Sequence, residues 1–166
     1  PNVNYFMNYD ANKFLYWIKL TGLEPGKEVA YQYFVNGDTR VADPFSPKML
    51  NEWDDSYIPA SRYPGLKAYP KNKTNGWVTV MQPGATKYEW KTTDFKRPLK
   101  SQLVIYECLI RDFTAAQTFK SVMDTLPYLK RLGITALQLM PITEFEGNIS
   151  WGYNPASHMA LDKYYG

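Results

Sequence analysis

The stretch GNISWGYNP, residues 147–155, contains the side chains of this sequence that are best suited to contacting a ligand. Its two glycines and its proline interrupt regular structure, so the stretch is predicted to be a loop. Trp151 and Tyr153 are large aromatic residues, and in a loop such rings either fold back onto the protein or are held out for a ligand. Because each ring combines an apolar face with a polar group, it suits the faces of sugar rings.

The composition is that of a folded protein rich in aromatic residues. The 166 residues are 45% hydrophobic and 21% charged, enough for one domain or for a small domain plus part of another. The net charge of +3 is spread along the chain, so nucleic acid is not an expected partner, and no stretch approaches the roughly 20 apolar residues of a membrane span. The 14 Tyr, 8 Phe and 5 Trp fit a sugar-binding surface or a β-rich core equally well.

The sequence contains one cysteine and one histidine, and neither is predicted to form a catalytic or metal site. Cys108 lies in the apolar run LVIYECLI and is predicted to be a small buried hydrophobe. His158 is predicted to be a solvated or loop-packed residue. No His, Cys and Asp residues have the spacing of metal ligands, and no glycine-rich loop resembles a phosphate site. We therefore expect these 166 residues to bind no cofactor.

The first part of the chain, residues 1–97, is predicted to be a β-sandwich. Apolar runs predict strands at 14–20, 28–35 and 76–82, and Asn-Gly at 36–37 predicts a hairpin with a returning strand at 39–45. The stretch LEPGKE at 23–28 is predicted to be a turn. Because the aromatic residues of these strands alternate, most of them are expected to face a core.

A long connection rich in proline, residues 43–76, is predicted to be irregular. Its aromatic residues are expected to pin it to a neighbouring surface; they are Phe45, Trp53, Tyr57, Tyr63 and Tyr69.

The second part, residues 98–166, has a different periodicity. The run 103–110 is predicted to be a strand buried on both faces, 119–133 an amphipathic helix with a kink or restart at Pro127, and 134–141 a second buried strand. Strand, helix and strand in this order form a right-handed parallel βαβ unit. Loops that follow the carboxyl ends of such strands build ligand sites, and GNISWGYNP lies in the loop after the second strand.

The sequence LPYLKRLGITALQLMPITEFEGNISWGYNP, continued by DKYYG, resembles the start of the catalytic barrel of glycoside hydrolase family 13, the α-amylase family. Its branching-enzyme-like and pullulanase-like members are the most similar in motif. LVIYECLIRDFT is similar to the first barrel strand, and LEPGKEVAYQYFVNGDTRVADPF to the immunoglobulin-like domain that commonly precedes the barrel. The resemblance implies an immunoglobulin-like sandwich at 1–97 and the first βαβ unit of a (β/α)8 barrel at 98–166.

The resemblance also implies roles for four residues of the last loop. Tyr153 takes the place of the aromatic residue that stacks on the sugar ring at the cleavage subsite, and Trp151 and Asn154 flank it. Trp151 is left open between loop packing and sugar contact. Glu144 is expected to bond sugar hydroxyls or to brace the loop, and bracing is favoured.

Catalytic residues are not expected in this chain. Retaining glycosidases need two carboxylates about 5–5.5 Å apart, and in this family they follow later barrel strands. No Asp or Glu here matches those motifs, and we expect the chain to stop before the third strand. The complete enzyme is expected to act on α-glucan with retention, with this chain packed against the rest of its barrel and with calcium as a family cofactor of the complete protein. The alternatives are a non-catalytic carbohydrate-binding module and a purely structural domain.

Overall fold

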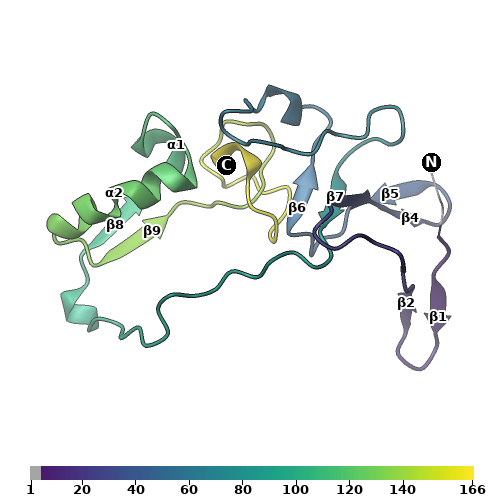
Figure 1. The fold of residues 1–166 in the computed structure, drawn as a ribbon, viewed down its shortest axis with the longest axis horizontal. Helices are drawn as coiled ribbons and strands as arrows, with labels where there is room; N and C mark the ends of the chain where they lie inside the picture. The colour runs from purple at the N-terminus through teal and green to yellow at the C-terminus, as the bar shows by residue number, and fades with distance from the viewer. Residues whose placement is uncertain (1–4) are drawn as a thin grey trace.

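A computed structural model describes residues 5–166, and it is mostly β with few helices. Figure 1 shows the α/β elements at one end, the short antiparallel strands at the other, and the C-terminal loop between them. An extended segment, residues 82–99, runs between the two ends without strand or helix. Among residues 5–166, no helix is both long and apolar enough to cross a membrane.

A three-stranded antiparallel sheet in the order β3-β7-β6 holds the core of the first part. Leu50, Val78 and Val80 form its buried cluster. The strand predicted at 76–82 is confirmed by β7 (Val78–Met81). The prediction that residues 43–76 are wholly irregular is wrong. β6 lies inside that segment, because Met49 and Leu50 pair with β7 between two prolines. The sheet strands are β3 (Val29–Tyr31), β6 (Lys48–Leu50) and β7 (Val78–Met81).

Two hairpins complete the first part. The predicted Asn-Gly turn is confirmed, since Asn36 and Gly37 have φ of 54° and 78° and Val35 pairs with Thr39. The turn at 23–28 is confirmed by a hydrogen bond of 3.2 Å from the Lys27 amide to the Glu24 carbonyl. The predicted strands at 14–20 and 28–35 are shorter or divided. The hairpin strands are β1 (Asn8–Asp10), β2 (Leu15–Trp17), β4 (Tyr33–Val35) and β5 (Thr39–Val41).

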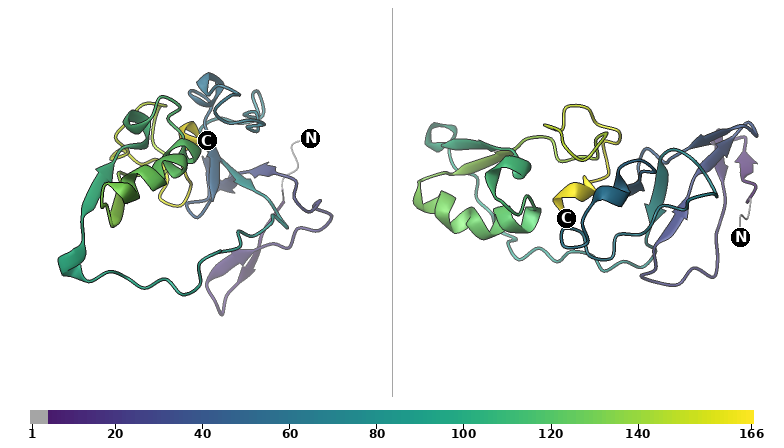
Figure 2. Two further views of the ribbon diagram at one scale, coloured as in Figure 1. Left: turned by 60° about the vertical axis from the view of Figure 1, so that its left-hand side comes forward. Right: turned by 90° about the horizontal axis from the view of Figure 1, so that it is seen from above.

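Most aromatic residues of the first part do not face a core, so that prediction is wrong. Tyr31 and Tyr33 are packed, and both hydroxyls donate to Asp43 Oδ2 at 2.8 Å. On the β1–β2 hairpin, by contrast, Tyr16 is 69% exposed. The strands are only three residues long, and Figures 1 and 2 show the hairpin projecting at the end of the molecule away from α2, where nothing in residues 5–166 forms a second layer over it. Other exposed aromatic residues of this part include Tyr9, Phe14, Trp17 and Phe34.

The aromatic residues of the connection 43–76 divide into two groups. Tyr63 and Tyr69 are partly buried, and the Tyr69 hydroxyl donates to the Gly76 carbonyl at 2.9 Å. Phe45, Trp53 and Tyr57 are exposed, which contradicts their expected role as anchors. The short 3-10 helix η1 (Asp55–Tyr57) lies in the same connection. Of these aromatic residues, Tyr69 packs against the buried cluster of the three-stranded sheet.

The second part contains the predicted parallel βαβ unit. β8 (Ile105–Cys108) pairs in parallel with β9 (Ala136–Leu139), and α2 (Phe119–Arg131) connects them. Thr118 caps α2 by accepting a hydrogen bond from the Ser121 amide at 3.1 Å. η2 (Lys100–Gln102) precedes β8, and α1 (Ile110–Phe113) follows it. The βαβ prediction is confirmed.

One detail of the βαβ prediction is wrong, and one of the two alternatives predicted for Pro127 is excluded. Ile105 of β8 is 58% exposed, because a two-stranded sheet leaves one face and both edges uncovered. The helix does not restart at Pro127, which lies inside the continuous α2. Val122 and Leu129 are buried before and after this proline, so packing holds both halves of the helix. Gly133, with φ of 85°, follows the helix as predicted.

The immunoglobulin-like sandwich and the barrel start remain predictions. A three-stranded sheet, two hairpins and one βαβ unit are what the described residues contain. A second buried cluster, formed by Ile110, Val122, Phe145 and Tyr165, joins the βαβ unit to the C-terminal loop. That cluster provides the floor on which the loop rests.

Candidate functional site

The loop at 141–166 is a folded-back segment with a closed base. The Glu144 amide donates to the Ala160 carbonyl at 2.9 Å, and the Asp162 amide donates to the Ile142 carbonyl at 2.9 Å. The Glu144 carbonyl accepts from the Ala156 amide at 2.8 Å. These bonds pair the outgoing and returning chains, and the loop ends in η3 (Lys163–Tyr165). Residues 147–155 therefore project from a fixed base.

Trp151 and Tyr153 project from this loop into solvent. Their exposed fractions are 64% and 67%. Gly152, between them, is buried, with φ of 88°. A Cβ atom there would lie 2.3 Å from the Pro141 carbonyl oxygen, so only glycine fits. The backbone is pressed against the end of β9 while the ring on either side stays accessible.

Asn154 holds the turn together. Its side chain bonds the Ser150 hydroxyl through Oδ1, and its Nδ2 donates to the Glu146 carbonyl at 3.3 Å. The same Ser150 hydroxyl accepts from the Gly152 amide at 2.9 Å. Both ends of the Asn154 amide are therefore used within the loop, although the residue itself is exposed.

Glu144 lies in the base of the loop, and its side chain is 4% exposed. Its Oε1 bonds the ammonium of Lys163, which is 2% exposed and lies 3.2 Å from Asp55 Oδ1. Burial raises the pKa of Glu144 to about 8, although Lys163 acts in the opposite direction. The Glu144 carboxyl is thus buried and in contact with a cation, whereas the Trp151 and Tyr153 rings are exposed.

Asp162 closes the returning end of the loop. Its Oδ1 accepts from the Tyr164 amide at 2.8 Å and its Oδ2 from the Phe145 amide at 3.3 Å. Burial raises the pKa of Asp162 to about 6, against the effect of these backbone hydrogen bonds. Sequence reasoning missed Asp162, Lys163 and Asp55. The Asp-Lys pair after an apolar stretch was the available indication, but Asp55 is distant in sequence.

The two other residues singled out in the sequence, His158 and Cys108, have the environments predicted for them. His158 is an exposed loop residue. Cys108 is buried, as predicted, and burial raises the pKa of its thiol. Within residues 5–166, no three His, Cys, Asp or Glu side chains are arranged to hold a metal ion, so no calcium site is assigned to this part of the protein. The loop can offer stacking faces and hydrogen bonds.

Known proteins with similar sequences and structures indicate the family of this chain. No family model matches the chain. The malto-oligosyltrehalose trehalohydrolase of Saccharolobus solfataricus is 34% identical over 78% of this chain and 21% of its own length. Pullulanase A of Streptococcus pneumoniae is 29% identical over 81% of this chain and 12% of its own.

A crystal structure of a candidate α-amylase from Salmonella typhimurium superposes with a TM-score of 0.68 and 26% identity, over 96% of this chain and 23% of that one. The chain belongs to the α-amylase family, glycoside hydrolase family 13. The resemblance inferred from its motifs is confirmed. This α-amylase-family chain spans about a fifth or less of the curated relatives named here.

Proposed function

We propose that this chain is part of an α-amylase-family enzyme that acts on α-glucan with retention, and that it supplies scaffold and one wall of the sugar site. Residues 1–97 would form an immunoglobulin-like domain and residues 98–166 the start of a (β/α)8 barrel. The relatives are named as enzymes of α-glucan and trehalose-linked oligosaccharides, which supports this substrate class. The catalytic carboxylates would come from elsewhere in the complete protein.

One observation carries the proposal. Two aromatic rings, Trp151 and Tyr153, are about two-thirds exposed on either side of a glycine that the end of β9 holds in place. A glucose ring presents C–H groups on one face, and an aromatic ring on an anchored backbone can cover them with less loop ordering at binding. Tyr153 is proposed as the stacking residue and Trp151 as a neighbouring sugar contact. Asn154 and Glu144 are proposed to position the loop.

The direct test is Tyr153→Ala in the complete enzyme. Losing a well-placed aromatic contact removes about 0.5–1.5 kcal/mol beyond the area term, and each ~1.4 kcal/mol is about tenfold in rate. We expect kcat to fall by about tenfold on every α-glucan tested, while Tyr153→Phe retains most of it. Tyr57→Ala, which removes an exposed tyrosine outside the loop, is the matched control. An unchanged kcat in folded Tyr153→Ala protein would exclude the assigned role.

The chain alone is proposed to be inactive. A polypeptide of these 166 residues should release no reducing sugar from starch or pullulan, because it lacks a matched pair of catalytic carboxylates. Its β8 would also present exposed apolar residues, which favours association. Reducing sugar released by a well-behaved monomer in solution would contradict both statements.

A carbohydrate-binding module is the second candidate, because exposed aromatic side chains gather on the β1–β2 hairpin. Tyr9 and Tyr16 lie with ring centroids 4.9 Å apart, but their planes are tilted by 41°, which does not make one flat platform. Affinity electrophoresis of residues 1–97 in amylopectin tests this alternative. Retardation that Trp17→Ala abolishes would favour the module, and unretarded migration would favour the scaffold.

A further inference from the structure

Lys163 is a buried cation at the boundary between the first part of the chain and the loop. Its ammonium lies 3.2 Å from Asp55 Oδ1 and bonds Glu144 Oε1, and it also lies 5.7 Å from the centroid of the Trp77 ring. All three ionisable side chains are at most 7% exposed. Water therefore contributes little to holding these groups, and they depend on one another.

Each acidic partner of Lys163 is fixed to its own part of the chain. Asp55 Oδ2 accepts from the Asn51 amide at 2.8 Å, and Asn51 directly follows β6 of the three-stranded sheet. Glu144 is fixed by its backbone to the returning chain of the loop at Ala156 and Ala160. The bridge thus connects two separately anchored segments.

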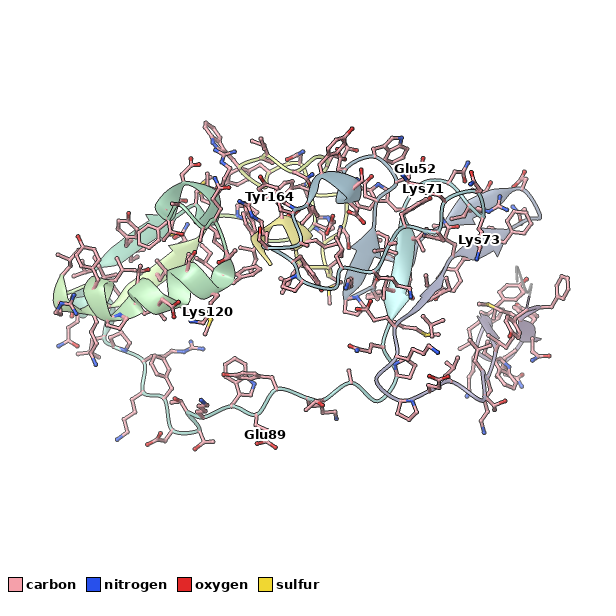
Figure 3. All side chains as sticks on the ribbon, turned by 45° about the horizontal axis from the view of Figure 1, so that its top comes forward. Glu52, Lys71, Lys73, Glu89, Lys120 and Tyr164 are labelled. Carbon is pink, nitrogen blue, oxygen red and sulfur yellow. The ribbon has the colours of Figure 1, made fainter. Side chains whose placement is uncertain are left out.

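Further contacts cross the same boundary. The Asn148 side chain donates to the Asp54 carbonyl at 2.8 Å, directly joining the Trp-Gly-Tyr loop to the segment that carries Asp55. A cavity of about 220 Å³ has walls from both sides, with Trp53 and Trp77 from the first part and Glu146 from the loop. Nearby, the Arg62 guanidinium stacks on the Tyr164 ring at 4.0 Å, and Tyr164 is labelled at η3 in Figure 3.

We propose that the Asp55–Lys163–Glu144 bridge is a positioning unit that fixes the Trp151–Tyr153 loop against the first part of the chain. The inference rests on the proposed function, because it gives the first part a role in shaping the sugar wall. Buried ion pairs contribute little net stability compared with apolar groups of the same volume, but they can select one arrangement. The bridge has the connectivity for that task, since it joins the end of β6 to the base of the loop.

The test compares three variants of the complete enzyme. Lys163→Met removes the cation, and the triple variant Asp55→Asn, Glu144→Gln, Lys163→Met removes all three ionisable groups so that no charge is left unpaired. Lys120→Met is the matched control: Lys120 pairs with Asp124 on the surface of α2, where its side chain is 75% exposed (Figure 3). Hydrogen–deuterium exchange of residues 147–155 and the separate kcat and KM values are measured for each.

We expect exchange at 147–155 to accelerate by about tenfold or more in Lys163→Met and in the triple variant. Because misplacing a binding group by about 1 Å costs up to about a hundredfold in rate, kcat should fall by about tenfold to a hundredfold. Exchange of α2 should stay unchanged in the triple variant, and Lys120→Met should leave both measurements at wild-type values. If Lys163→Met does not fold, the triple variant decides.

The outcomes separate the inference from the proposed function. If Tyr153→Ala lowers kcat while the triple variant keeps wild-type exchange at 147–155 and wild-type kcat, the bridge does not position the loop and the inference is overturned. If exchange accelerates but Tyr153→Ala leaves kcat unchanged, the bridge holds the loop and the proposed sugar contact is wrong. A fall in kcat with unaltered exchange also contradicts positioning.

Discussion

Two of the regions that carry exposed aromatic side chains, the β1–β2 hairpin and the loop that follows β9, differ in how their backbone is anchored. On the hairpin, Tyr16 is supported by pairing of three-residue strands and by its contact with Tyr9. On the loop, Trp151 and Tyr153 stand above a buried glycine, a paired backbone base and a buried ion bridge. The two regions therefore differ in the anchoring of their backbone and not in the exposure of their rings. This anchoring is the reason for which we propose the loop, and not the hairpin, as the sugar wall.

The largest expected effect comes from the floor of the loop. Tyr165→Ala removes a side chain that is 1% exposed and packs edge-on to Phe119 and Phe145, at centroid distances of 5.7 and 6.0 Å. Such truncations of buried aromatic residues cost about 3–5 kcal/mol. Tyr16→Ala on the hairpin should change the free energy of unfolding by less than about 1 kcal/mol. Chemical denaturation of both variants measures the difference, and equal losses would contradict the comparison.

A smaller effect is expected from the backbone beneath the rings. Gly152→Ala forces a left-handed residue and a clash with the Pro141 carbonyl, so we expect a loss of about 2–4 kcal/mol or a displaced loop. Gly147→Ala is the matched control, since Gly147 has φ of 79° and open space around its Cβ position. It should cost only the conformational part, about 1–2 kcal/mol. Similar thermal shifts for the two variants would show that the contact with Pro141 is not tight.

The strands and the helix of the βαβ unit could be predicted because their periodicity is local. The hairpin at 36–37 could likewise be predicted, because its two adjacent turn residues tolerate positive φ. β6 was missed because its three residues lie between prolines and are recognised only by pairing with β7. Of the kink or restart predicted at Pro127, the restart is excluded, because tertiary packing of Val122 and Leu129 outweighs one missing hydrogen bond.

The candidate site could be predicted only in part. The loop and its exposed rings follow from glycine, proline and aromatic residues close in sequence. The Asp55–Lys163 contact joins residues from opposite parts of the chain, and neither carries a local pattern that marks burial. A buried lysine is rare enough that composition favours an exposed side chain.

Glu144, in the base of the loop, is expected to make the free energy of unfolding depend on pH. Its pKa is raised by burial from 4.5 to about 8, so the folded state binds the proton more tightly than the unfolded state between these values. Its contribution to stability is present below about pH 4.5 and is lost as the pH rises to about 8. Asp162, with its pKa raised to about 6, acts in the same direction over a lower range.

Glu144→Gln should therefore gain stability relative to wild type as the pH rises through this window. The measurement is the free energy of unfolding of both proteins at several pH values, with Asp55, Asp162 and Lys163 present in each. A difference that stays constant with pH would contradict a raised pKa for Glu144.

The smallest effect is expected at the Tyr165 hydroxyl. It is buried without a hydrogen-bond partner in the described structure, so Tyr165→Phe removes an unsatisfied group and should leave the free energy of unfolding unchanged or raise it by about 1 kcal/mol. A loss above about 1 kcal/mol would reveal a partner for the hydroxyl.

We propose that the anchored loop, and not the hairpin, contacts α-glucan. The most direct measurement is kcat/KM of the complete enzyme on a soluble α-glucan for two double variants, Trp151→Ala with Tyr153→Ala and Tyr16→Ala with Trp17→Ala. We predict a loss of at least about tenfold for the loop pair and an unchanged value for the hairpin pair. A loss confined to the hairpin pair would contradict the account.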